Sequence, residues 1–152
     1  MPYVPATRVI DAAATRPSFV LIVDDSADAR ALYGEYLEFC GFRVATARDG
    51  IEAVLVAQQD LPDIIIMDLA MPRLDGWEAI RELKAHPRTS GIPVIAVSAY
   101  TTGDAVVRAR EAGAEVCLAK PCLPSQVARA IRALLVWRRT AATVESGNRE
   151  IG

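Results

Sequence analysis

Three carboxylates, one hydroxyl and one amine stand where apolar runs of the sequence stop. Asp24 and Asp25 end the run "FVLIVDD", and Asp68 ends "DIIIMD". Ser98 follows "IPVIAV", and Lys120 follows "EVCLA". Burying a lone carboxylate costs free energy, and clustered carboxylates repel one another unless a cation lies among them. These residue types therefore predict a site at which acids share a cation.

The chemistry open to this group is transfer of a phosphoryl group to a carboxylate. Oxygen ligands without His or Cys favour a hard metal ion, Mg²⁺, with Mn²⁺ as the alternative. A carboxylate such as Asp68 can act as a covalent nucleophile and form an acyl phosphate. The metal and Lys120 would neutralise the phosphoryl oxygens, while the Ser98 hydroxyl would donate a hydrogen bond to one of them.

Each of these residues alone also has a simple structural explanation. Asp24 and Asp25 precede a helical pattern, where acids commonly serve as caps, and Asp68 could cap the loop after its strand. A Lys-Pro pair is usually a solvated turn. The joint placement of all of them at strand ends favours a shared functional site.

The elements that must position these side chains are strands of a parallel sheet. Apolar runs rich in Val and Ile occupy residues 19–25, 42–47, 63–69, 92–99 and 115–120. Helical patterns lie between and after them, at 26–40, 50–59, 75–85, 101–112 and 124–137. This alternation predicts βα units, and in a parallel sheet the carboxyl ends of all strands meet at one edge. The five side chains would meet there.

Composition limits the classes of protein to consider. The 152 residues, 52% hydrophobic and 24% charged, suit one globular domain, and a net charge of -2 gives no support to nucleic-acid binding. No apolar run could span a bilayer, and the N-terminus lacks the apolar part of a signal peptide. We expect a cytoplasmic domain over residues 18–138, monomeric or weakly dimeric, with mobile tails at 1–17 and 139–152. The odd number of cysteines predicts free thiols, with a redox pair of Cys117 and Cys122 as the alternative.

Four motifs occur in order at the expected strand ends: "LIVDDSADAR", "IIIMDLAMPRLDG", "IPVIAVSA" and "CLAKP". In this combination the chain resembles the receiver domain of two-component response regulators, of the stand-alone type. The resemblance implies a flavodoxin-like (βα)₅ fold, a doubly wound parallel sheet of five strands in the order 2-1-3-4-5. It also implies that Asp68 accepts the phosphoryl group. Mg²⁺ would then be held by Asp25 and Asp68 directly, by Asp24 mostly through water, and by the Ala70 backbone carbonyl.

The resemblance further implies that Ser98 and Lys120 bind the phosphoryl group and that Pro121 follows a cis peptide bond. The phosphoryl group would come from a phosphohistidine on a sensor histidine kinase or a His phosphotransfer protein. His86 is expected to be a surface residue and not that histidine.

The implied function is signal transduction through protein contacts that depend on phosphorylation, without a separate enzymatic substrate. Three alternatives are a phosphorelay intermediate, a degenerate receiver used as a structural interaction domain, and an aspartyl-phosphate phosphatase of the haloacid dehalogenase class. The phosphatase would need Asp-x-Asp after the first strand.

Two departures from the receiver pattern carry expectations of their own. Receivers usually have Tyr or Phe three residues before the lysine, and here that position is Cys117, which lacks a ring that could swing inward. Cys122 stands where receivers often have Phe. Near the site, Ala70 and Tyr100 offer no acid or amide suited to orienting an attacking water. We therefore expect a changed output switch and slow loss of the phosphoryl group.

Overall fold

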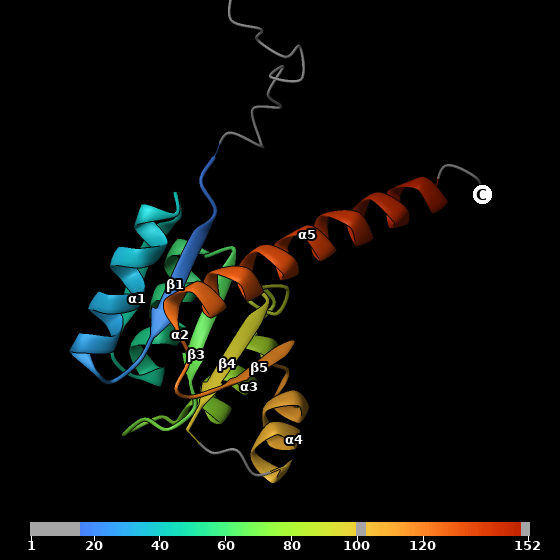
Figure 1. Ribbon diagram of the computed structural model, residues 1–152. Helices are drawn as coiled ribbons and strands as arrows, with labels where there is room; N and C mark the ends of the chain where they lie inside the picture. The colour runs from blue at the N-terminus through green and yellow to red at the C-terminus, as the bar shows by residue number, and fades with distance from the viewer. Residues whose placement is uncertain (1–15, 100–102, 150–152) are drawn as a thin grey trace, which may run out of the picture.

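Five parallel strands and five helices alternate along the chain, in a computed structural model that describes residues 16–99 and 103–149, with side chains up to residue 141. The elements are β1 (Phe19–Val23), α1 (Ala27–Phe39), β2 (Arg43–Ala47), α2 (Gly50–Asp60), β3 (Ile64–Asp68), α3 (Gly76–Ala85), β4 (Val94–Ser98), α4 (Gly103–Ala112), β5 (Val116–Ala119) and α5 (Pro124–Arg149). The strand order is β2-β1-β3-β4-β5 (Figure 1). The predicted fold class is confirmed.

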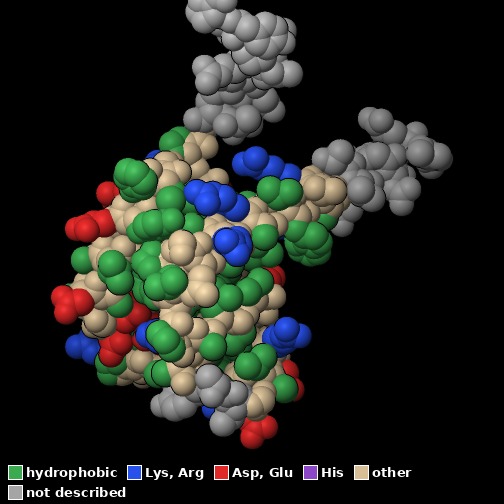
Figure 2. Space-filling view, viewed as in Figure 1, with side chains coloured by type: hydrophobic (Ala, Val, Ile, Leu, Met, Phe, Trp, Pro, Cys, Tyr) green, Lys and Arg blue, Asp and Glu red, His purple; other side chains and the backbone are tan. Residues whose placement is uncertain are grey.

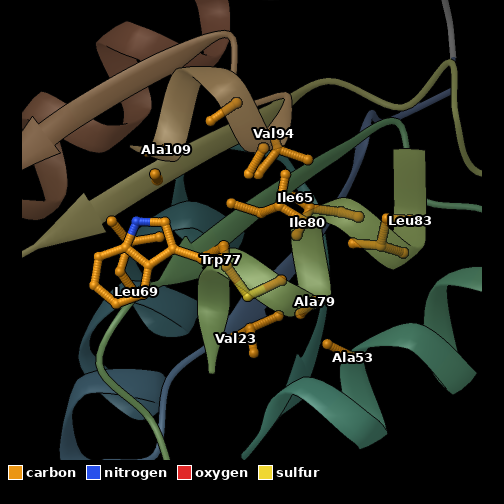
Figure 3. Close-up of a cluster of buried hydrophobic side chains, with 14 of the residues drawn as sticks. Val23, Ala53, Ile65, Leu69, Trp77, Ala79, Ile80, Leu83, Val94 and Ala109 are labelled. Carbon is orange, nitrogen blue, oxygen red and sulfur yellow. The ribbon is translucent and has the colours of Figure 1, made fainter. Parts of the chain in front are cut away.

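Both faces of the sheet are covered, which explains why the strands are apolar throughout. Every residue of β1, β3 and β4 is buried. Side chains of one face pack with α2, α3 and α4 in one buried cluster, part of which Figure 3 shows around Trp77 and Ile80. Side chains of the other face pack with α1 and α5 in a second cluster, which includes Leu37 and Ile131. The sheet thus forms the middle layer of three.

Helix caps fix the loops that leave the carboxyl ends of the strands. The Asp49 carboxylate accepts a hydrogen bond from Glu52 N at 2.8 Å, and Asp75 accepts one from Glu78 N at 2.9 Å. Both are the caps expected from an acid three residues before a glutamate. Gly41 ends the first helical segment with a φ of 96°, a conformation that favours glycine.

The last helix is longer than the sequence pattern predicts. An end at Trp137 was expected because hydrophobic periodicity stops there, but α5 continues to Arg149 and projects from the body of the domain (Figure 1). Basic side chains gather over its domain-facing half (Figure 2). Residues after 137 include several good helix formers and no proline, so backbone propensity favours continuation of the helix beyond Trp137. Among the described helices, none has both the length and the apolar character needed to span a bilayer.

Candidate functional site

The register of the sheet brings the predicted side chains to one edge. Val23 of β1 pairs with Met67 of β3, so Asp24, just after β1, and Asp68, the last residue of β3, lie at the same level. Asp68 itself pairs with Val97, directly before Ser98. Lys120 follows β5, and its backbone N–H donates to the Ser98 carbonyl at 2.8 Å. Residues up to 96 positions apart therefore share one site.

Three carboxylates form a compact group of oxygen ligands. One carboxylate oxygen from each of Asp24, Asp25 and Asp68 lies within 4.8 Å of the other two. Asp24 and Asp68 are each only 4% exposed, whereas Asp25 faces solvent. A group with two buried acids and one acid at its mouth is open to an incoming ion. This all-oxygen donor set fits Mg²⁺.

Lys120 places a positive charge beside two of these carboxylates. Its Nζ lies 3.4 Å from Asp24 Oδ2 and 3.5 Å from Asp68 Oδ2. Burial of the ammonium lowers its pKa, but attraction by Asp68 and Asp24 outweighs that effect, so the pKa of Lys120 lies above its ordinary value. Lys120 therefore remains charged, with one ammonium facing two buried carboxylates.

Asp68 remains short of favourable interactions despite this lysine. Burial raises the pKa of its carboxyl from 3.8 to about 6, and the charge of Asp24 adds to the rise. Lys120 and a hydrogen bond from Ala70 N to Asp68 Oδ1, at 3.2 Å, act in the opposite direction. Because desolvation is the largest contribution to the shift, keeping Asp68 ionised in the folded protein costs free energy. A carboxylate in that condition gains by binding a cation.

Asp24 is held by the start of α1. Its Oδ1 accepts a hydrogen bond from Ser26 N at 2.9 Å, and its backbone carbonyl accepts one from Arg30 Nη1 at 2.8 Å. The Ser26 hydroxyl accepts from Ala29 N at 3.2 Å and caps the helix. Asp24 is therefore not the cap of α1, and its second carboxylate oxygen is directed to the site.

The remaining predicted residues take the following places. Ser98 is 1% exposed at the end of β4, and the Lys120–Pro121 peptide bond is cis. Ala70 lies on the exposed loop after β3, and its backbone N–H donates a hydrogen bond to Asp68 Oδ1. Tyr100 lies outside the described residues. The individual roles given to Ser98, Lys120 and the Ala70 carbonyl stay predictions.

One neighbouring residue was not singled out as functional in the sequence. Tyr33, on α1, donates its hydroxyl hydrogen to the carbonyl oxygen of Cys122 at 2.6 Å. This bond ties α1 to the segment just after Lys120. Tyr33 falls on the apolar face of the predicted helix, so only its hydroxyl distinguishes it from a core residue.

The cysteines and the histidine do not take part in the site. Cys40, Cys117 and Cys122 are free thiols, as predicted, and burial raises the pKa values of Cys117 and Cys122. His86 ends α3 at the opposite edge of the sheet, where its Nδ1 accepts a hydrogen bond from Arg88 N at 3.1 Å. His86 is half-buried and not fully on the surface as expected, and its exclusion as the phosphohistidine stays a prediction.

Comparison with known proteins identifies the family. The profile of the response regulator receiver domain matches residues 20–132. The chain belongs to the response regulator receiver family. Receiver domains are signalling modules of two-component systems and partner with histidine kinases.

Individual relatives agree with this assignment. The chain is 38% identical to the transcriptional regulatory protein PrrA of Mycobacterium tuberculosis over 94% of its own length but only 60% of PrrA. The chain thus spans less than two thirds of the curated relatives that it matches first. Chemotaxis protein CheY4 of Vibrio cholerae is 29% identical, with a TM-score of 0.74 over 78% of this chain and 98% of CheY4.

A third relative shows the ion expected at such a site. The receiver domain of the sensor histidine kinase PA1611 from Pseudomonas aeruginosa is 30% identical, with a TM-score of 0.72 over 78% of this chain and 97% of that domain. Its structure has a magnesium ion coordinated in the active-site cleft. The three carboxylates of the present receiver form a similar acidic cluster.

Proposed function

We propose that this receiver accepts a phosphoryl group on Asp68 from a phosphohistidine of a sensor histidine kinase or phosphotransfer protein. The observation that carries the proposal is the position of Asp68, a buried carboxylate 3.5 Å from the ammonium of Lys120 and grouped with two further acids. Phosphorylation would then change which protein contacts the domain makes, because a phosphoryl group adds about -1.5 to -2 charge at this edge.

Asp24, Asp25 and Asp68 would hold Mg²⁺, with the Ala70 carbonyl as a further oxygen. The donor set fits because its three carboxylates lie within 4.8 Å of one another and the buried Asp68 is short of positive charge. When bound, the ion neutralises charge on the phosphoryl oxygens. The magnesium in the PA1611 receiver supports the same assignment here.

Three side chains of this receiver would act in the transfer step. A carboxylate oxygen of Asp68 forms a bond to phosphorus while the bond from phosphorus to the donor's imidazole nitrogen breaks, and the imidazole keeps that electron pair. Asp68 must be ionised to attack, which its pKa of about 6 allows at neutral pH. Lys120 would pair with the transferred group, and the Ser98 hydroxyl would donate a hydrogen bond to one of its oxygens.

Intact-mass measurement after incubation with acetyl phosphate and Mg²⁺ tests the phosphoacceptor. We expect the wild type to gain one phosphoryl group and Asp68→Asn to gain none. Asp60→Asn is a matched control, because Asp60 is an exposed acid at the end of α2. A wild type that stays unmodified, or an Asp68→Asn variant that is modified like the control, would contradict the proposal.

The lifetime of the phosphoryl group is a second part of the proposal. Ala70, two residues beyond Asp68, has no side-chain group that could orient a water molecule for attack on phosphorus. We therefore propose slow self-dephosphorylation, measured as loss of the added mass after the donor is removed. Ala70→Asn supplies an amide and should shorten the half-life. A wild-type half-life of seconds that no substitution at Ala70 changes would refute this part.

Two outcomes are possible for the acyl phosphate once a partner is present. In a signalling receiver, a target protein binds the phosphorylated form more tightly than the unmodified form. In a phosphorelay intermediate, a His phosphotransfer protein removes the phosphoryl group instead. Following the label on Asp68 while candidate partners are added separates these two functions.

A further inference from the structure

We propose that Trp77 carries the state of Asp68 to helix α4, which gives the receiver an output route through α3. This inference rests on the proposed phosphorylation of Asp68 and adds the path by which it is read. The position three residues before Lys120 is Cys117, a half-buried thiol that has no ring to move. Trp77 is an aromatic side chain that contacts α4 from the helix after the phosphoacceptor loop.

The start of α3 is in direct contact with the backbone of the phosphoacceptor. A Cβ atom added at Gly76 would lie 2.4 Å from the Asp68 carbonyl oxygen and 2.6 Å from Leu69 Cα. Gly76 N also donates a hydrogen bond to the Leu69 carbonyl at 3.0 Å. Since no free space separates these two backbone segments, a displacement at Asp68 moves the first residue of α3.

Trp77 comes next in the chain and reaches across to α4. Its side chain is 8% exposed and belongs to the buried cluster that contains Leu69 and Ala109, and Figure 3 shows the indole ring near both. The indole Nε1–H donates to the Ala105 carbonyl on α4 at 3.5 Å. The guanidinium of Arg108, also on α4, lies 4.3 Å from the centre of the indole ring.

The strength of these contacts suits a switch. A hydrogen bond of 3.5 Å is at the outer limit of the interaction, so a shift of a few tenths of an ångström makes or breaks it. A cation–π contact at an exposed site changes an equilibrium by a factor of about 2 to 5. Together they hold α4 firmly enough to bias its position and weakly enough to be exchanged.

The coupling is tested by hydrogen exchange of the α4 amides, Gly103–Ala112, before and after treatment with acetyl phosphate and Mg²⁺. Trp77→Phe keeps a ring in the core but removes the indole N–H. Trp137→Phe is the matched control, because Trp137 is 63% exposed on α5. Arg108→Gln removes the cation from an exposed position and leaves the core intact.

We expect phosphorylation to change α4 exchange equally in the wild type and in Trp137→Phe. The change should shrink by about twofold or more in Arg108→Gln, which loses the cation–π contact, and by about twofold or more in Trp77→Phe, which loses the hydrogen bond to the Ala105 carbonyl. Intact mass measured on the same samples shows whether each is phosphorylated, so a failure of Asp68 to accept the group is distinguished from a failure of coupling. An unchanged α4 in phosphorylated wild type, or an undiminished change in both variants, would overturn the inference.

Fluorescence gives an independent measurement of the same coupling. The chain has two tryptophans, so in the Trp137→Phe protein all tryptophan emission comes from Trp77. Phosphorylation should shift that emission, and Asp68→Asn in the same background should show no shift. An emission unaffected by phosphorylation would also count against the inference.

Discussion

Replacing Asp68 by asparagine should make the metal-free protein more stable at neutral and alkaline pH. The carboxyl is 4% exposed, and its pKa rises from 3.8 to about 6, first through burial and then through the charge of Asp24. A raised carboxyl pKa means that the folded state binds the proton more tightly than the unfolded chain. The ionised form therefore opposes folding, and a neutral amide of the same shape removes that cost.

The magnitude follows from the size of the shift. A rise from 3.8 to about 6 corresponds to about 3 kcal/mol, because one pKa unit is about 1.4 kcal/mol. Solvent screening at the open mouth of the site, where Asp25 is exposed, reduces this to about 1 to 2 kcal/mol. Asp68→Asn should gain that amount in the free energy of unfolding.

The gain depends on pH in a defined direction. Above about pH 6, Asp68 is ionised in both the folded and the unfolded wild type, so the full cost is present. Below 3.8 the carboxyl is protonated in both states, and the cost disappears. The advantage of Asp68→Asn should therefore fade as the pH falls from about 6 to about 4.

Urea unfolding in the presence of EDTA, at about pH 8 and about pH 4, measures this difference directly. The exposed-acid variant Asp60→Asn should differ from the wild type by less than about 0.5 kcal/mol at both pH values. Adding Mg²⁺ should stabilise the wild type and have much less effect on Asp68→Asn. If Asp68→Asn were less stable than the wild type at the higher pH without metal, attraction by Lys120 would outweigh burial, and this reasoning would be refuted.

Three further predictions concern the same edge of the sheet. Gly76→Ala should lower the free energy of unfolding in urea by more than about 3 kcal/mol, because the added Cβ would lie 2.4 Å from the Asp68 carbonyl oxygen. Gly103→Ala is the control and should be nearly neutral, because among the described residues no atom beyond its neighbours along the helix lies within 4 Å of a Cβ added there. Tyr33→Phe removes the 2.6 Å hydrogen bond to the Cys122 carbonyl and should cost about 1 to 2 kcal/mol in the same assay. The dissociation constant for Mg²⁺, measured by calorimetry, should rise by up to about tenfold per pH unit below about pH 6, as protons compete for Asp68, and a constant independent of pH would contradict that assignment.

Much of the site could be predicted because topology alone brings it together. Asp24, Asp68 and Lys120 each follow an apolar run, and a parallel sheet has one carboxyl edge. The caps at Asp49 and Asp75 were also visible, since a capping box is a local pattern. Predictions of this kind need only the order of elements along the chain.

Features that depend on how helices lie against one another were not visible. The contact of Trp77 with α4 and the bond from Tyr33 to the Cys122 carbonyl join elements 28 and 89 residues apart, and no local pattern marks them. The end of α5 was placed too early for a different reason. Hydrophobic periodicity stops at Trp137, whereas the backbone of α5 continues as a helix to Arg149.

Helix α5 has a mechanical consequence that follows from its length. The domain grips it through Val127, Ile131 and Leu134, while the backbone helix continues to Arg149. Arg138, which donates a hydrogen bond to the Gly91 carbonyl, lies about 17 Å along the helix axis from Arg149, at about 1.5 Å per residue. A rod held at one end acts as a lever, so a tilt of about 5° at the held end would move the far end by about 1.5 Å, given that length. Sub-ångström repacking in the core would thus become a displacement large enough for another molecule to sense.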